Sequence, residues 1–351
     1  MKKNTIKKIC LILCFALMVF LNINAGSYLS YSFMFDRADS IDYEITPGFI
    51  NYEEHKDLLV KRYEVCFTSG ELDVTFSAVC GYLYLVNEYS PTIVISGGYN
   101  NVADSLLSYH KYFTSLGYNV FAYDYTGTGN SSSIQNGFIQ PLIDLRYALY
   151  FINSDGRIKN KNVALFGYSA GAFASSAILN INNIKVNIRA VVSINGYDDA
   201  YNLFVNKAKS KIGFLSYLGA PSIYIHQNKL FEDYCKYTAV DGINNKQNLP
   251  VLIIQSKKDK SIPYDSLSIY AKQNNITNKN VSYKLFDTHD HTSILYDESA
   301  LVYQKEVNKI LKKTIGRENK KEYLSTIDDE NYSKINVELM NDVMNFYKKY
   351  I

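Results

Sequence analysis

The sequence predicts an α/β protein whose mostly parallel, mixed sheet is flanked by helices. Apolar runs that are typical of buried strands alternate along the chain with helical segments of about 10–15 residues, which is the pattern of βαβ units. The first two strand segments, 61–69 and 76–86, are close neighbours in the sequence and predict a hairpin, which makes the sheet mixed.

The other elements follow in the order that this fold class requires. Short apolar runs predict strands at 91–96, 118–124, 162–166, 189–195, 249–256 and 281–287. Helical periodicity predicts helices at 102–116, 139–154, 170–180, 299–314 and 335–350. The helix at 139–154 carries its apolar stripe at Leu142, Leu145, Leu149 and Ile152.

These elements divide the chain of 351 residues into four parts. We expect a signal peptide or N-terminal membrane anchor at 1–25 and a lead-in segment at 26–60. The main α/β domain covers 61–315 and contains a small helical insertion, a cap, at about 197–247, where no strand pattern occurs. Residues 316–351 form a charged linker and a C-terminal amphipathic helix.

The N-terminus resembles an export signal. Four lysines (Lys2, Lys3, Lys7 and Lys8) precede the apolar run Ile9–Leu21, and a cleavage site is possible after Ala25. A spanning helix needs about 20 apolar residues, and Asn22 and Asn24 interrupt this run early. We therefore expect export, with cleavage and secretion preferred, and with a single-pass anchor that holds the protein to a membrane through residues 9–21 as the alternative.

Composition argues against several classes of site. The net charge is +3, and neither zinc-finger spacing nor a basic-aromatic RNA motif occurs, so we expect no nucleic-acid partner. None of the five cysteines lies in a CxxC motif, so we expect no metal site. Cys66 and Cys80 fall on neighbouring strands and would pair only in an exported chain; we expect both to be small buried hydrophobic residues.

The most informative stretch is Gly167-Tyr168-Ser169-Ala170-Gly171. It follows a predicted strand and opens a predicted helix, which is the setting of a nucleophile elbow. The Ala170 N–H group is expected to bind the oxyanion of the reaction. The stretch 95–101 ends an earlier strand with two glycines and offers a second donor from Gly98 or Tyr99.

A serine nucleophile needs a histidine as its base. The five histidines are His55, His110, His226, His289 and His291. The last two follow the final strand, at the same edge of the sheet as Ser169, whereas the first three are expected to be structural or surface residues. We assign the base to His291, because the neighbouring Asp290 would hold His289 as a charged surface pair.

The base in turn needs an acid to orient it. Asp259 follows the strand 249–256 in a loop at the same edge of the sheet, and the order Ser169, Asp259, His291 is that of one known triad arrangement. Asp198 and Asp199 are the alternative acids. Asp287 and Asp290 are interpreted as loop residues.

These ordered motifs together resemble the α/β-hydrolase superfamily over about residues 60–315. The loop residues Asp124, Gly127, Gly129 and Ser131 are similar to the family's D-x-x-G-x-G-x-S turn. Ser96 and the pair Gln255-Ser256 stand where the family commonly has His and His-Gly, so the oxyanion donor besides Ala170 stays open between Gly98 and Tyr99. The general likeness is to the esterase, lysophospholipase and monoacylglycerol-lipase-like branch.

The resemblance implies a serine hydrolase that cleaves carboxylic esters, including lipid or acylglycerol esters, through an acyl-enzyme and without a cofactor. A small-molecule or lipid ester is the expected partner. A peptidase, amidase or thioesterase on the same triad is the alternative, and a non-catalytic binding module is the third hypothesis. The insertion is rich in Tyr and Phe, which predicts either an apolar substrate pocket or the insertion's own core.

Overall fold

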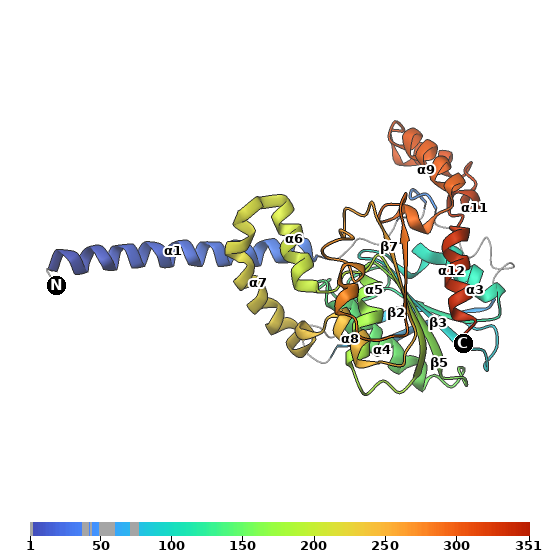
Figure 1. Ribbon diagram of the computed structural model, residues 1–351. Coiled ribbons are helices and arrows are strands. Elements are labelled where there is room, and N and C mark those ends of the chain that lie inside the picture. Colours follow the sequence, from blue (N-terminus) through green and yellow to red (C-terminus); the bar gives the residue numbers. More distant parts are fainter. Residues whose placement is uncertain (1–2, 37–41, 43, 49–59, 71–76) are drawn as a thin grey trace.

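The computed structural model describes residues 3–36, 42, 44–48, 60–70 and 77–351 (Figure 1). The turn of the first hairpin and His55 lie outside these residues. A compact α/β body carries two projections in Figure 1: the helix α1 (Lys3–Met34) with α6 (Ala200–Ile212) and α7 (Ser216–Phe231) on one side, and α9 (Glu298–Leu311) on another.

The body is built on an eight-stranded sheet with the order β1-β2-β4-β3-β5-β6-β7-β8. Strands β1 and β2, and β2 and β4, pair antiparallel, and the remaining neighbours pair parallel, so the predicted mixed sheet is present. The strands are β1 (Arg62–Ser69), β2 (Ser77–Tyr84), β3 (Thr92–Ser96), β4 (Asn119–Tyr123), β5 (Asn162–Tyr168), β6 (Asn187–Ile194), β7 (Val251–Ser256) and β8 (Val281–Phe286).

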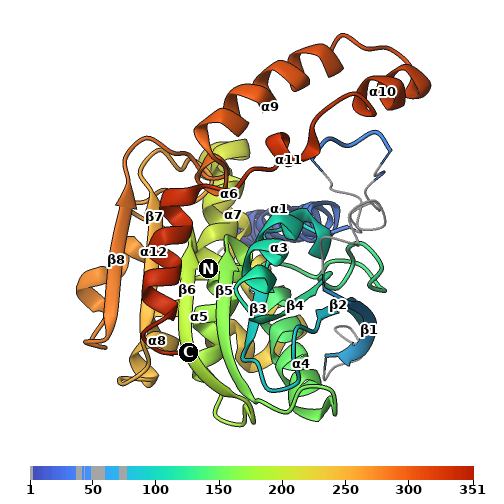
Figure 2. The same cartoon turned by 90° about the vertical axis from the view of Figure 1, so that its right-hand side faces the viewer.

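Helices cover both faces of the sheet, as the buried central strands require (Figure 2). One face packs against α4 (Gln140–Ser154), α5 (Ala170–Ala177) and α8 (Ala239–Asn245). The other packs against α3 (Leu107–Ser115) and α12 (Val337–Tyr347).

The C-terminal helix belongs to the core, contrary to the domain boundary that we placed at 315. In α12, Leu339, Val343 and Tyr347 are fully buried, and the Tyr347 hydroxyl donates a hydrogen bond to the Leu165 carbonyl oxygen in β5 (2.7 Å). By contrast α9 leads away from the sheet together with α10 (Arg317–Leu324) and α11 (Asp329–Tyr332), and only Ala300 and Val307 of α9 are buried. The strongly amphipathic α12 therefore covers the sheet, although we placed it outside the α/β domain.

The insertion between β6 and β7 consists of α6, α7 and α8 with short 3-10 turns. Its aromatic residues differ in burial. Phe204 and Phe231 are buried and belong to the main hydrophobic core, whereas Phe214, Tyr217 and Tyr224 are exposed. The buried aromatic residues therefore join the core of the whole fold, and the exposed ones face the surroundings of the insertion.

The N-terminal helix is longer and more closely joined to the fold than the sequence suggested. The amides of Asn22 and Asn24 donate to the carbonyl oxygens of Met18 and Phe20 in the same helix, so they do not end the apolar span, which covers 21 residues, Ile9–Leu29. A signal sequence and a membrane-crossing helix both meet that length and composition. Beyond the span, Tyr31 and Phe35 are buried in the core.

Cys66 and Cys80 form a disulfide, so the prediction of two separate buried thiols is wrong. The two residues stand directly opposite each other on the antiparallel strands β1 and β2. Such pairing places their Cβ atoms within reach of a bridge, which sequence spacing alone did not reveal.

Candidate active site

Ser169 stands at a sharp turn between β5 and α5. Its φ of 55° lies in the left-handed region, which a residue other than glycine occupies at an energetic cost. The turn brings the chain close to itself: a β-carbon on Gly171 would collide with the Ser96 carbonyl oxygen, and one on Gly167 with the Gly171 carbonyl oxygen. Close approach, rather than positive φ, is therefore what requires glycine at both positions.

The structure brings together the three side chains that the sequence analysis grouped. His291 Nε2 lies 2.9 Å from Ser169 Oγ, and His291 Nδ1 lies 2.6 Å from Asp259 Oδ2. The three residues come from the ends of β5 and β7 and from the loop after β8, which meet at one edge of the sheet. The imidazole thus bridges the serine hydroxyl and the carboxylate in one hydrogen-bonded chain.

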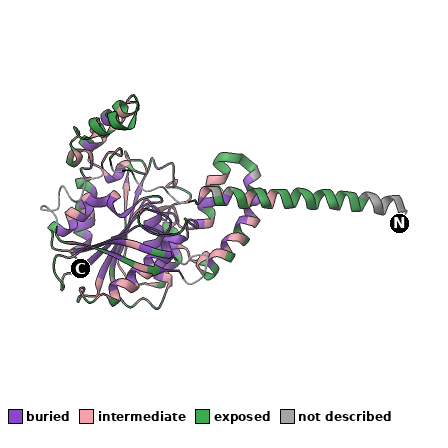
Figure 3. Cartoon of the chain, turned by 180° about the vertical axis from the view of Figure 1, so that it is seen from behind, coloured by how far each residue is buried: buried purple, intermediate pink, exposed green. Residues whose placement is uncertain are grey.

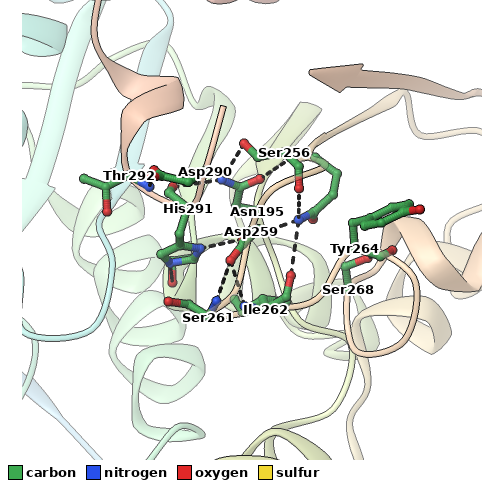
Figure 4. A network of polar contacts seen from close by, with 12 residues as sticks. Asn195, Ser256, Asp259, Ser261, Ile262, Tyr264, Ser268, Asp290, His291 and Thr292 are labelled. Atoms are coloured by element: carbon green, nitrogen blue, oxygen red, sulfur yellow. Dashed lines mark hydrogen bonds and ion pairs between the residues drawn. The ribbon is translucent and has the colours of Figure 1, made fainter. Parts of the chain in front are cut away.

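The Asp259 side chain is fully buried and has several hydrogen-bond donors around it (Figure 4). Its Oδ1 atom accepts hydrogen bonds from the backbone N–H groups of Ser261 and Ile262, both at 2.8 Å. Its Oδ2 atom also accepts a hydrogen bond from Gln255 Nε2 (3.3 Å). Gln255, which replaces a residue common in the family, therefore helps to hold the acid in place.

Two further side chains fix the loop that carries His291: Asn195, which the sequence analysis missed as a site residue, and Tyr168, which it placed in the nucleophile elbow without this role. Asn195 Nδ2 donates to the His291 carbonyl oxygen (2.9 Å), and its Oδ1 atom accepts a hydrogen bond from the Ser256 N–H group (2.7 Å). The Tyr168 hydroxyl donates to the same His291 carbonyl oxygen (3.0 Å). The signal for Asn195 is its place directly after a buried strand, at the edge where the other site residues lie.

The remaining histidines lie elsewhere. His289 contacts the Thr288 hydroxyl and the ring of Phe286, His110 is buried in α3 beside Tyr84, and His226 packs against the rings of Tyr28 and Tyr31. We rejected His289 because we expected it to pair with Asp290. The Asp290 carboxylate instead accepts hydrogen bonds from the N–H groups of Thr292 and Ser293, so that reason is wrong. The orientation of the loop, and not a neighbouring charge, places His291 rather than His289 against Ser169.

The alternative acids, Asp198 and Asp199, have other partners. Asp198 accepts a hydrogen bond from the Val240 N–H group, and Asp199 caps the N-terminus of α6. Asp287, which we interpreted as a loop residue, forms an ion pair with Lys257. Within the described part of the chain, none of the three forms a hydrogen bond or ion pair with a histidine. Asp259 is thus the acid that the geometry pairs with His291.

Backbone N–H groups suited to an oxyanion lie beside Ser169. Gly98, Tyr99 and Ala170 line the same cavity as Ser169, and no recorded hydrogen bond of the described residues uses their N–H groups. The loop 97–103 is held by the predicted turn after β4, since Asp124 accepts hydrogen bonds from the N–H groups of Ala103 and Asn130. The donor that joins Ala170 stays open between Gly98 and Tyr99.

A cavity of about 560 Å³ opens above Ser169. Apolar side chains form much of its wall: Met34, Leu106, Phe138, Leu203, Ile262 and Leu295. Its described lining includes the cations Lys207 and Lys211 but no aspartate or glutamate. Burial lowers the pKa of Lys207, and the charge of Asp259 opposes this shift.

Chemically, the arrangement can carry out acyl transfer. The imidazole can take the proton of Ser169 while Oγ attacks a carbonyl carbon, and Asp259 can stabilise the resulting imidazolium. Two N–H groups can bind the oxyanion that forms. The apolar wall can hold an acyl group in a site from which much water is excluded.

Comparisons with known proteins bear on the family and the fold of the chain. The profile of the prolyl oligopeptidase family matches residues 105–317. An esterase of Pyrococcus furiosus has a TM-score of 0.54 and 16% identity, over 80% of this chain and 97% of that chain. The α/β hydrolase GrgF of a Penicillium species has a TM-score of 0.51 and 14% identity, over 72% of this chain and 99% of that chain. No curated protein matches the sequence. The likeness to solved structures confirms the predicted α/β-hydrolase fold.

Proposed function

The chain belongs to the prolyl oligopeptidase family, and we propose that this serine hydrolase of the α/β-hydrolase fold cleaves carboxylic esters. The observation that carries the proposal is the hydrogen-bonded chain from Ser169 Oγ through His291 to Asp259, at the base of a largely apolar cavity. Ser169 attacks the ester carbonyl carbon, and His291 takes the serine proton. The tetrahedral oxyanion is bound by the N–H groups of Ala170 and of Gly98 or Tyr99.

Acylation is completed when the ester C–O bond breaks and the leaving alcohol takes the proton from His291. Deacylation repeats these proton movements with water as the nucleophile: water attacks the acyl carbon while His291 accepts its proton. The bond between the acyl carbon and Ser169 Oγ then breaks, Oγ takes the proton from His291, and the product is a carboxylic acid.

The charges of the cavity favour an ester over a peptide with a free N-terminus. An α-ammonium group needs an acceptor, yet the described lining offers Lys207 and Lys211 and no carboxylate.

The family match supports the alternative, a peptidase or amidase on the same triad, because the family is named for oligopeptidases. A panel of p-nitrophenyl esters and aminoacyl p-nitroanilides distinguishes the two, and we expect turnover of the esters.

The nucleophile is tested by covalent labelling. A fluorophosphonate probe followed by mass spectrometry should modify Ser169, and Ser169→Ala should lose both labelling and ester turnover while keeping its melting temperature. Wild-type turnover by the folded Ser169→Ala protein would refute the proposed mechanism.

We further propose that the catalytic domain lies outside the cytoplasm and that α1 stays attached as its anchor. The Cys66–Cys80 disulfide supports export, because such bonds persist in oxidising compartments. The N-terminal lysines favour a cytoplasmic start of the helix. Cleavage after Ala25 would cut the continuous helix α1 close to the residues that pack against α7, which favours an uncleaved anchor over a cleaved signal. Membrane fractionation with N-terminal sequencing tests this: we expect membrane-bound protein that retains residues 9–25.

A further inference from the structure

The helical region formed by α1, α6 and α7 presents apolar side chains on one side of the molecule. In Figures 1 and 3, α1 leaves the body as a long exposed rod, and α7 packs against it. Four side chains around the turn between α6 and α7 are each more than half exposed: Ile212, Phe214, Tyr217 and Leu218. Apolar surface beside a 21-residue apolar helix is what contact with a lipid bilayer would cover.

A second cavity, also of about 560 Å³, lies within this helical region. Its walls are mainly apolar and come from both sides: Ile23 and Met34 on the α1 side, and Phe204, Ile212, Leu218 and Ile223 on the α6–α7 side. Lys211 is the one charged residue among its described lining residues. A cavity of this kind suits a hydrocarbon chain better than a polar group.

The second cavity meets the cavity above Ser169. Met34 and Lys211 line both, so the two cavities share a boundary at these side chains. The boundary is tied to the oxyanion loop, because the Tyr99 hydroxyl donates a hydrogen bond to the Met34 carbonyl oxygen (2.8 Å). A chain that occupies the second cavity would therefore point with one end toward Ser169.

We propose that this second cavity holds the long acyl chain of a membrane lipid ester, which reaches Ser169 from the bilayer between α1 and the α6–α7 pair. The inference rests on the proposed ester hydrolysis and adds the substrate class. The acyl carbon forms a bond to Ser169 Oγ, the lipid alcohol leaves with the proton from His291, and water releases a long-chain fatty acid. The exposed apolar surface keeps the mouth of the cavity at the membrane.

Gly26 offers a position from which a large side chain would block the cavity. It lines the second cavity, and a β-carbon added there would meet no atom within 4 Å, so the backbone of α1 leaves room for the start of a side chain. The neighbouring Ala25 is exposed and does not line either cavity, which makes Ala25→Trp a matched control for Gly26→Trp.

The experiment compares hydrolysis of p-nitrophenyl palmitate and p-nitrophenyl butyrate by the full-length protein in mild detergent. Gly26→Trp should lower the ratio of palmitate to butyrate turnover at least about tenfold, because only the long chain needs the second cavity. Ala25→Trp should keep the wild-type ratio. Ala208→Trp, which fills the same cavity from α6, replaces Gly26→Trp if the latter does not fold.

The outcomes separate this inference from the proposed function. If both esters are hydrolysed and the blocking variants leave the ratio at the wild-type value, the acyl-chain site is refuted while ester hydrolysis stands. If Ala25→Trp lowers the ratio as much as Gly26→Trp, the effect is not specific to the cavity and the inference is also refuted. If neither ester is hydrolysed and Ser169 is not labelled, the proposed function fails as well.

Discussion

Two regions of the molecule differ in how far their side chains are buried and hydrogen-bonded. One is the edge of the sheet that carries Ser169, and the other is the helical region of α1, α6 and α7. At the sheet edge, the Asp259 carboxylate is fully buried and surrounded by hydrogen-bond donors. In the helical region, large apolar side chains face outward, and Phe214 is 74% exposed. The reacting groups thus rest on a hydrogen-bonded scaffold formed by the chain itself, whereas the helical region exposes an apolar surface, which we propose the bilayer covers.

The largest expected effect concerns the two histidines of the loop after β8, of which only His291 contacts Ser169. His291→Ala should lower the kcat for p-nitrophenyl butyrate at least about 10³-fold, because among the residues that the structure describes His291 is the base hydrogen-bonded to the nucleophile. His289→Ala should lower it no more than about tenfold. Steady-state kinetics on both variants measure the difference.

Fluorophosphonate labelling adds a readout that does not depend on turnover. Ser169 should lose its reactivity in His291→Ala and keep it in His289→Ala. The reverse pattern would transfer the role of base to His289 and contradict the geometry described above.

The second prediction contrasts Phe35, which follows α1 and is buried in the core, with Leu11, which lies on the exposed part of α1. Phe35 directly follows the helix, is 1% exposed and packs against the rings of Tyr99 and Phe138, whereas Leu11 is 76% exposed. Phe35→Ala should reduce the free energy of unfolding by about 3 kcal/mol, as large-to-small core substitutions do. Leu11→Ala should leave it unchanged within about 0.5 kcal/mol. Chemical unfolding of the full-length protein in detergent measures both, and equal values would show that α1 is not docked through its end.

The third prediction concerns the turn at Ser169. Gly171→Ala should destabilise the protein by about 2–3 kcal/mol, because the added carbon meets the backbone oxygens of Ser96 and Gly97, which cannot move away as a flexible side chain would. Gly156→Ala is the control, since nothing lies within 4 Å of an added carbon there. A melting temperature for Gly171→Ala equal to that of the control would mean that the turn relaxes more easily than the packing indicates.

The sequence predicted the sheet edge well for a physical reason. A strand, a Gly-x-Ser-x-Gly turn and a helix form a local pattern, and the ends of parallel strands meet at one edge, so Ser169, Asp259 and His291 were placed there without knowledge of any contact. The Asn195 contacts were not predicted, because they join three separate loops and depend on side-chain directions that no local pattern encodes.

The helical region was predicted less well because its features are long-range. The docking of Tyr31 includes a hydrogen bond to the Asn136 carbonyl oxygen, 105 positions away.

The position of α12, outside this region, has the same kind of cause. This helix contacts β5 through the Tyr347 hydroxyl, although the charged stretch before it suggested a separate tail. Amphipathicity predicts that a helix packs, but it does not say against which element it packs.

The smallest expected effect tests whether the scaffold positions His291 as well as stabilising the fold. Asn195 has a φ of 51°, so Asn195→Gly removes its hydrogen bonds while glycine adopts this backbone conformation without strain. With the hydrogen bond to the His291 carbonyl oxygen lost, the imidazole is held less firmly against Ser169, and kcat should fall about tenfold with little change in KM.

The control for this last variant is Glu232→Gly, which replaces another residue of positive φ (46°) at an exposed position outside the site. It should leave kcat at the wild-type value.

Tyr168→Phe removes the second hydrogen bond to the His291 carbonyl oxygen. It should lower kcat by a smaller factor, since Asn195 still holds the loop. If Asn195→Gly lowers the melting temperature but not kcat, its side chain supports the fold without positioning the base. Asp259 and Tyr168 would then be sufficient to orient His291.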